Sequence, residues 1–217
     1  EGTSKQSAWL DYTKKKVSSD CVLNLSENLA SKTTFKIGGL SEYYAEPSSI
    51  SDVLALIQSS QLFGLPYFCL GRGSNILVAD AGYRGLVIRF NHKNWQKIRK
   101  IDDSHIWVGC GARLKNLCGK AAQLGFSGFE FLEGIPGSLG GALRMNAGAM
   151  GRWTFDVVVR VLMVNDASEV KELGRDEFTI EYRRVPEIAN GIALGAILKL
   201  KEVETSDSIR ERMDSYS

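Results

Sequence analysis

Residues 133–151 read EGIPGSLGGALRMNAGAMG, a stretch in which glycine and alanine leave very little side chain on the backbone. Such a stretch is typical of a backbone that another group approaches closely or packs tightly against. Pro136 fixes a turn, and Ser138 is placed to cap a short helix whose face around Gly140 and Gly141 is nearly smooth. A ligand could lie on this face, and packing against another helix is the alternative.

A second glycine-rich stretch, residues 70–80, reads LGRGSNILVAD and resembles a G-x-G-x-x-G dinucleotide fingerprint. A true fingerprint opens a helix, but here Ile76 replaces the third glycine and residues 76–78 form an apolar run typical of a strand. We therefore predict a loop between strands, in which glycines aim backbone N–H groups at an anion and Ser74 and Asn75 add donors. An ordinary tight turn is the alternative. Two such loops in one chain favour a long ligand that carries both a phosphate and a flat ring.

The composition is that of an ordinary soluble protein: 217 residues, 44% hydrophobic and 24% charged. A net charge of +2, with lysine and arginine spread along the chain, indicates no patch for nucleic acid or a membrane surface. His92 and His105 lack metal-ligand spacing, so no metal site is expected. The cysteines lie far apart, which predicts reduced, buried thiols in a cytoplasmic protein: Cys21, Cys69, Cys110 and Cys118.

The hydrophobic pattern predicts two mixed α and β units, residues 1–96 and 97–205, and the start of a further helix at 206–217. The first unit is expected to contain a βαβ-like segment, with Ser49 and Asp52 at capping-box spacing before its helix. The expected strands are one that ends at Pro47 and residues 67–70, 76–78, 86–90, 106–110, 157–164 and 192–200. The expected helices are residues 49–61 and residues 112–124, the second of which Gly125 ends.

The two glycine-rich stretches, LGRGSNILVADAGYRGLVIRF and GIPGSLGGALRMNAGAMG, are followed by Glu181-Tyr182-Arg183. In this order they resemble the FAD-binding part of the UDP-N-acetylenolpyruvoylglucosamine reductase (MurB) family of bacterial peptidoglycan synthesis. The upstream LASKTTFKIGG is similar to the family's entry segment, so the resemblance covers nearly the whole chain.

The resemblance implies an α+β, two-lobed FAD-binding fold of the p-cresol methylhydroxylase type. Residues 1–96 and 97–205 would be the two lobes. Residues 206–217 would begin a linker helix to a substrate-binding domain that the given residues do not include.

The resemblance also implies which residues hold FAD. The first loop would bind the pyrophosphate through Gly71, Arg72, Gly73, Ser74, Asn75 and Ile76. The second region would line the pyrophosphate and the flavin through Gly134, Ile135, Pro136, Gly137, Ser138, Gly140, Gly141, Asn146 and Gly148.

Tyr182 and Arg183 match the family's tyrosine and arginine near the flavin. In the family NADPH reduces the flavin, and an enolpyruvyl UDP-sugar then takes a hydride at its alkene. A permanent guanidinium suits this step, because hydride addition builds negative charge on the neighbouring carboxylate as an enolate. The alternative is that Arg183 is a surface ion-pair partner beside Arg184.

Two departures from the family pattern affect the expected activity. The family usually follows tyrosine-arginine with one residue and a serine, whereas this chain has Arg184-Val185-Pro186, so a local hydrogen bond is expected to be missing. The family's proton-donating serine and a glutamate would lie beyond residue 217, and neither Ser215 nor Ser217 takes that role. A general acid must lie within hydrogen-bond reach of the carbon it protonates. We therefore expect these residues to bind FAD without completing the reduction.

Two other functions remain open at this stage. One is an oxidase of the same FAD superfamily, which often attaches FAD covalently next to a glycine-rich loop; Cys110 lies between Gly109 and Gly111. The other is a flavin-binding module without chemistry. In each case the expected ligand is small, and neither nucleic acid nor a membrane is an expected partner.

Overall fold

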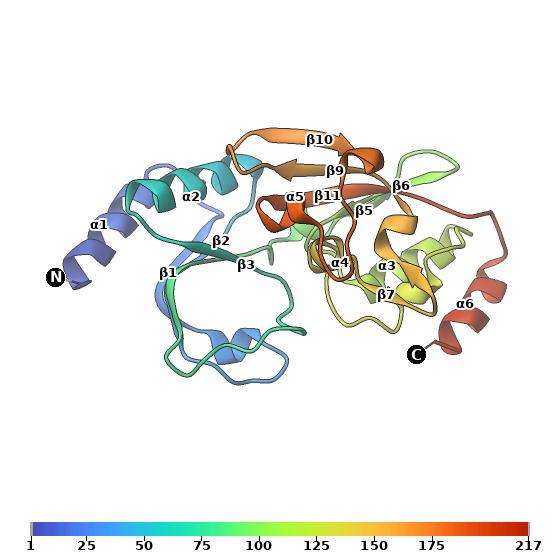
Figure 1. Ribbon diagram of the computed structural model, residues 1–217, viewed down its shortest axis with the longest axis horizontal. Coiled ribbons are helices and arrows are strands. Elements are labelled where there is room, and N and C mark those ends of the chain that lie inside the picture. The colour runs from blue at the N-terminus through green and yellow to red at the C-terminus, as the bar shows by residue number, and fades with distance from the viewer. Residues whose placement is uncertain (1, 217) are drawn as a thin grey trace. The chain divides into compact units, whose positions relative to one another are not determined.

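A computed structural model describes residues 2–216, which form two compact units, Glu1–Asn94 (unit 1) and Trp95–Ser217 (unit 2) (Figure 1). Each unit contains its own sheet, of four strands in unit 1 and of five strands in unit 2. Helices accompany both sheets. The fold class predicted from the sequence, α+β, is correct.

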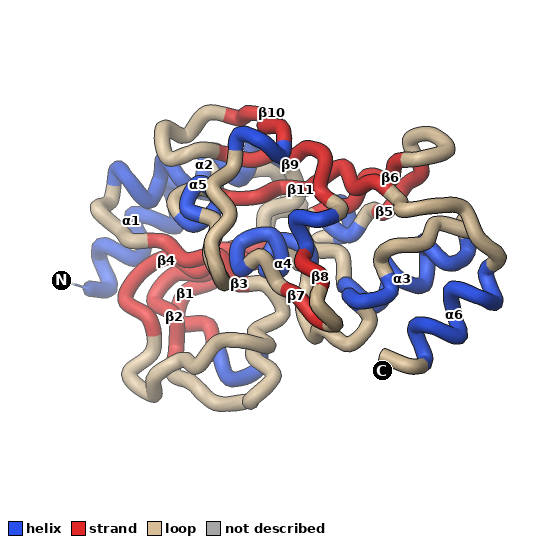
Figure 2. The backbone as a smooth tube through the Cα atoms, turned by 45° about the vertical axis from the view of Figure 1, so that its right-hand side comes forward, coloured by secondary structure: helices blue, strands red, loops and turns tan. Residues whose placement is uncertain are grey.

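Unit 1 is built on a mixed sheet in the order β1-β2-β4-β3 (Figure 2). β2 and β3 run parallel to β4, and β1 pairs antiparallel with β2. The strands are β1 Val22–Asn28, β2 Leu40–Glu46, β3 Tyr67–Leu70 and β4 Tyr83–Arg89. The helices are α1 Gly2–Lys14 and α2 Ile50–Leu62, with the 3₁₀ turn η1 Leu29–Lys32, and η2 Lys93–Gln96 follows at the junction with unit 2.

The two faces of β2 pack against different parts of unit 1, because successive side chains of a strand point to opposite faces. Tyr43 meets the buried Trp9 of α1 edge-on, with ring centroids 4.9 Å apart. Tyr44 packs with Leu29 and Leu70 in a small apolar cluster, against which Ile76 also lies. The glycine-rich loop therefore lies on the face of the sheet opposite to α1.

The predicted βαβ-like segment is confirmed as β2, α2 and β3, and Ser49 and Asp52 form the predicted capping box. Residues 76–78 are not a strand, which corrects the sequence prediction. Val78 contacts the turn at Gly38, and the next residue, Ala79, accepts a hydrogen bond from Gly39 N–H. α1 was not predicted, because it lacks an apolar stripe and is held chiefly by the buried Trp9.

Asp52 joins the start of α2 to the chain that follows α1. Its carboxylate is buried and accepts hydrogen bonds from the backbone N–H groups of Ser18 (2.7 Å), Ser48 (2.9 Å) and Ser49 (3.2 Å). The hydroxyl groups of Ser18 and Ser48 also donate to it, at 3.0 and 2.8 Å. The capping side chain is thus also the central acceptor of a buried polar network.

The Asp52 network predicts a pH dependence of stability. Burial by itself raises the pKa of Asp52, but the donated hydrogen bonds from Ser18 and Ser48 outweigh it and lower the pKa below the ordinary 3.8. A carboxyl with a depressed folded pKa stabilises the fold fully above its unfolded pKa and loses this contribution as the pH falls through the folded pKa. We expect urea unfolding midpoints to fall more steeply below pH 3.8 for the parent chain than for Asp52→Asn. Parallel pH profiles for the two proteins would contradict this assignment.

Unit 2 is built on an antiparallel sheet in the order β10-β9-β11-β6-β5. Its strands are β5 Ile98–Lys100, β6 His105–Gly109, β9 Val158–Val164, β10 Val170–Gly174 and β11 Ile192–Lys199, and a separate hairpin joins β7 Gly148–Ala149 to β8 Arg152–Trp153. Its helices are α3 Leu114–Gln123, α4 Leu139–Met145, α5 Pro186–Ala189 and α6 Ser206–Asp214, with 3₁₀ turns η3 Glu130–Leu132, η4 Thr154–Asp156 and η5 Arg175–Glu177.

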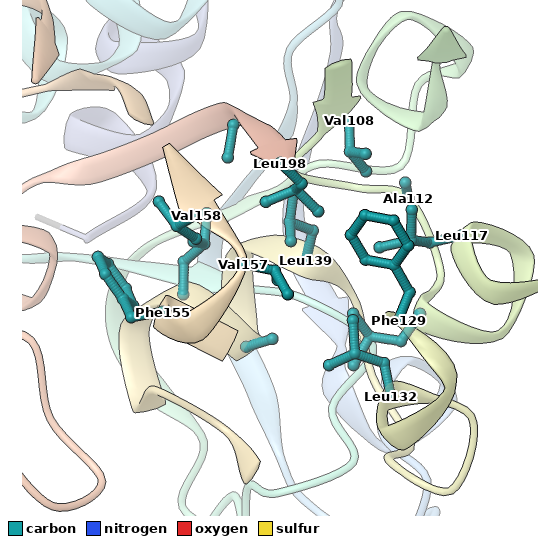
Figure 3. Packing of buried hydrophobic residues seen from close by; sticks show 14 of the residues in the cluster. Val108, Ala112, Leu117, Phe129, Leu132, Leu139, Phe155, Val157, Val158 and Leu198 are labelled. Atoms are coloured by element: carbon teal, nitrogen blue, oxygen red, sulfur yellow. The ribbon is translucent and has the colours of Figure 1, made fainter. Parts of the chain in front are cut away.

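The core of unit 2 lies between its sheet and the helices α3 and α4 (Figure 3). Leu117 of α3 and Leu139 of α4 lie with Val108 and Leu198 of the sheet in this cluster. α3 has the predicted apolar face and ends, as predicted, before Gly125, whose φ is +71°. Because α4 packs in this core, the core also fixes where the segments before and after α4 begin.

The cysteines form no disulfide, and only two of the four, Cys110 and Cys118, are buried. Burial raises the pKa of the Cys118 thiol well above its ordinary value. Among the described residues, no helix is long and apolar enough to cross a bilayer.

Candidate functional site

The first predicted loop, residues 71–76, follows β3 directly and lies on the neighbouring turn after η1. Of its two glycines only Gly73 has a positive φ, +66°. A Cβ on Gly73 would stand 2.7 Å from Lys32 O and from Thr33 Cα, and Thr34 N–H donates to Gly73 O at 3.0 Å. Gly73 is therefore required by contact within the chain, whereas Arg72 and Asn75 are exposed.

Residues 33–40 and 76–82 lie side by side next to this loop and are joined by backbone hydrogen bonds. Gly39 N–H donates to Ala79 O at 2.9 Å, and a Cβ at Gly39 would overlap the backbone of Asp80. Four large apolar side chains in these two segments are exposed: Phe35, Ile37, Leu40 and Leu77. The six predicted residues of the first loop therefore lie together, on a turn whose shape depends on glycine.

The second predicted region, in unit 2, contains glycines with different surroundings. Gly140 N–H donates to Cys110 O at 2.8 Å, and a Cβ at Gly140 would lie 3.2 Å from that oxygen. Gly134 approaches Tyr216 O, and Gly137 has a φ of +151°. The smooth helix face thus packs on the backbone after β6, and the alternative of packing against another helix is wrong for Gly140. Gly141 differs, because no atom lies within 4 Å of the position of its missing Cβ.

The ends of α4 are set by Ser138 and Asn146. Ser138 is the N-cap residue, as predicted, but its side chain makes no capping hydrogen bond. Asn146 ends the helix with a φ of +39°, and its Oδ1 accepts a hydrogen bond from Phe155 N at 3.1 Å. Within residues 2–216 its amide NH₂ has no hydrogen-bond partner. Asn146 therefore keeps a donor that a ligand can use.

Tyr182 and Arg183 form the tip of a tight turn. Glu181 N–H donates to Arg184 O at 3.0 Å, and Arg184 N–H donates to Glu181 O at 3.4 Å. Arg183 has a φ of +57°, and the Tyr182 side chain is 79% exposed. In the described part of the chain, Arg183 makes no ion pair, while Arg184 pairs with Glu181 at 4.0 Å. The expected surface ion pair thus belongs to Arg184, and the Arg183 guanidinium is uncompensated.

The turn lies beside the second glycine region although the two are far apart in sequence. Val185 N–H donates to Arg144 O at the end of α4, at 3.2 Å. The Arg144 guanidinium donates to Ala189 O of α5 at 2.9 Å. The Tyr182 ring meets the Trp153 ring nearly at right angles, with centroids 6.1 Å apart. The backbone N–H of the buried Val185 thus ties the turn to α4.

Sequence reasoning missed Trp153 and Arg144. Trp153 lies two residues beyond the glycine-rich stretch, and a bulky aromatic next to so many small residues was a usable signal. Arg144 was visible only as one charged residue of a short helix, so its bonds to α5 could not be inferred.

Two other features of unit 2 do not belong to this constellation. A cavity of about 570 Å³ is lined by residues that include Glu130, Glu204 and Arg212, but by none of the predicted site residues. Three of its charged groups pair with one another, since Arg212 binds Glu130 and Glu204 at 2.7 Å each. Cys110 is only 3% exposed, which does not favour covalent attachment of a flavin there.

Comparison with known proteins identifies the family of the chain. The FAD binding domain family matches residues 41–174. The chain is 39% identical to the UDP-N-acetylenolpyruvoylglucosamine reductase of Clostridium tetani over 193 residues, which is 83% of this chain and 62% of that relative. The crystal structure of the reductase of the same name (MurB) from Thermus caldophilus has a TM-score of 0.76 and 30% identity, and covers 90% of this chain and 67% of its own.

A more distant structure shows how widely the fold is shared. BBE-like #28 from Arabidopsis thaliana has a TM-score of 0.62 at 16% identity, over 88% of this chain and 42% of its own. This likeness concerns the fold alone. The chain spans less than two thirds of the length of the curated relative from Clostridium tetani.

Proposed function

Since the chain belongs to the UDP-N-acetylenolpyruvoylglucosamine reductase family, we propose that it is the FAD-binding part of an enzyme of peptidoglycan synthesis. The reaction would convert UDP-N-acetylglucosamine enolpyruvate into UDP-N-acetylmuramate, with NADPH as the electron donor. The proposed substrate is therefore a small UDP-sugar. We propose that the protein acts in the cytoplasm.

One observation carries the proposal: an uncompensated guanidinium is held beside the second glycine region. The bond from Val185 N to Arg144 O and the contact between Tyr182 and Trp153 bring this turn to the end of α4 and the hairpin that follows it. A pure cofactor cradle has no need of a permanent cation that lacks an internal partner.

The residues present fit FAD in both units. In unit 1 the loop 71–76 offers an exposed backbone and the exposed side chains of Arg72 and Asn75 for a pyrophosphate. In unit 2, Gly141 leaves open space on α4, and the NH₂ of Asn146 is a spare donor. We propose that these residues hold the cofactor, together with the exposed Gly148 and the neighbouring predicted positions.

Bound FAD would accept a hydride from NADPH and pass it to the alkene of the substrate. The role of Arg183 follows from charge: its guanidinium is a cation that would stabilise the negative charge that builds on the substrate carboxylate as an enolate. Tyr182 presents an exposed phenol beside it. Completion of the reduction also needs a proton at the second alkene carbon, and we assign no residue of this chain as its donor.

A substitution at Gly141 is expected to affect cofactor binding and folding stability in opposite directions. Because a Cβ at Gly141 meets no atom of the chain, Gly141→Ala should raise the free energy of unfolding by about 0.5–1 kcal/mol, the usual gain for alanine over glycine in a helix. The same methyl group would overlap a cofactor lying on α4 and lower FAD affinity about tenfold. Urea titrations and flavin fluorescence titrations measure the two effects on one protein.

Gly119→Ala is the matched control. Gly119 lies within α3, and no atom lies within 4 Å of the position of its missing Cβ. We expect the same gain in stability with FAD affinity unchanged. Equal FAD affinities for both variants would show that the cofactor does not lie on α4.

The oxidase alternative is tested by denaturing the FAD-loaded protein. Colour that stays with the polypeptide would indicate a covalent flavin and would overturn the reductase proposal, whereas release of all flavin is the expected result. A protein that contains this chain together with a substrate-binding domain, binds FAD and shows no flavin reoxidation by the enolpyruvyl UDP-sugar would favour the binding module instead.

A further inference from the structure

The turn that carries Arg183 is strained and needs contacts that hold it. A φ of +57° is unfavourable for any residue with a Cβ. Such a conformation persists only where the surrounding structure enforces it. The two hydrogen bonds between Glu181 and Arg184 close the turn but do not fix its direction.

The base of the turn is fixed by two further hydrogen bonds. Val185 N–H donates to Arg144 O at 3.2 Å, and Thr179 N–H donates to Glu187 Oε1 at 3.0 Å. The tip is different. Within residues 2–216 the Arg183 side chain makes no hydrogen bond, ion pair or ring contact, and the Tyr182 side chain makes one ring contact, with Trp153. The position of the tip therefore depends on the Trp153 ring.

The Trp153 residue is 38% exposed, but its ring is supported from one side. A Cβ at Gly148 would overlap the indole ring, so the ring lies directly on the backbone of β7. Trp153 N–H donates to Asp156 Oδ2 at 2.8 Å. The preceding residue anchors the hairpin, since the Arg152 guanidinium donates to Gly128 O at 2.9 Å and lies 5.0 Å from the centre of the Phe131 ring.

We propose that Trp153 is a positioning residue that holds the tip of the Tyr182–Arg183 turn, and that Gly148 provides the flat backbone on which its ring lies. The catalytic consequence of this inference rests on the proposed function: the guanidinium of Arg183 reaches the substrate carboxylate from one direction. An arginine on a mobile turn would lose much of its stabilising effect, because catalytic charge must be preorganised.

Amide hydrogen exchange of the 217-residue chain tests the positioning directly. Loss of an edge-to-face aromatic pair raises the equilibrium constant for local opening about two- to tenfold. Trp153→Ala should therefore speed exchange at the Glu181 and Arg184 amides by about this factor, and Trp153→Phe should restore the rate to within about twofold. Met150→Ala, in the turn of the same hairpin, is the control and should leave both rates unchanged.

Two results would overturn the inference. One is an unchanged exchange rate at both amides in Trp153→Ala. The other is a uniform increase that also includes core amides such as Val161 and Ala196, because it would mean general destabilisation.

The visible spectrum of the FAD-loaded chain separates this inference from the proposed function. If Tyr182 lies at the flavin, Trp153→Ala and Tyr182→Ala should shift the flavin bands alike, and Trp153→Phe should not. Faster exchange without any spectral change would overturn the placement of Tyr182 at the flavin and leave the role of Trp153 intact.

Discussion

Replacing Arg183 by glutamine should slow reduction of the enolpyruvyl UDP-sugar by about 10²- to 10³-fold, the usual effect of removing one preorganised group at a developing charge. Glutamine keeps a hydrogen-bond donor but removes the permanent charge that no other described residue pairs with. The measurement is single-turnover reoxidation of the flavin, after reduction with NADPH, on addition of the UDP-sugar to a protein that contains this chain together with a substrate-binding domain. Single-turnover conditions detect slow reaction even where steady-state turnover is absent.

Arg184→Gln is the control for this prediction. Arg184 has the same charge and belongs to the same turn, but it pairs with Glu181. Its replacement should change the rate by less than about threefold, in keeping with an exposed ion pair. Equal rates for the two variants would refute the assignment of Arg183. A protein that contains this chain together with a substrate-binding domain, and whose flavin is never reoxidised by the UDP-sugar, would refute the reductase proposal itself.

Asp52→Ala should lower the free energy of unfolding by about 3 kcal/mol or more. The change leaves the buried N–H group of Ser48 and the part-buried N–H group of Ser18 without their acceptor, and each unsatisfied buried donor costs about 1–3 kcal/mol. It also removes the link between α2 and the segment after α1. Urea unfolding followed by the fluorescence of the buried Trp9 reports on the affected unit.

Ser49→Ala separates the network from the helix cap. Ser49 Oγ accepts the capping bond from Asp52 N, at 3.2 Å, and also makes an exposed hydrogen bond with Ser51 Oγ, at 2.9 Å; loss of such a cap costs about 1 kcal/mol. We expect Asp52→Ala to be clearly more destabilising than Ser49→Ala. Equal losses would mean that Asp52 acts as a simple helix cap and that the serine network contributes nothing.

Prediction from the sequence succeeded where the signal was local. The capping box of α2, the apolar face of α3 and the stop at Gly125 each depend on residues a few positions apart, and all three are confirmed. It failed for residues 76–78, where a β-branched run contacts a turn instead of a strand. It also missed α1, because a single buried tryptophan leaves no periodic pattern.

The sequence by itself determined which residues are small, charged or aromatic, and its ordered motifs identified the family and the two glycine regions. Only the tertiary structure decided what each of these residues meets. Gly140 and Gly73 are explained by contacts within the chain, whereas Gly141 is left open. The same holds for Arg183 and Arg184, which look equivalent in sequence until a turn pairs one with Glu181 and leaves the other uncompensated. The physical reason is that packing and pairing depend on groups distant in sequence, which no local pattern records.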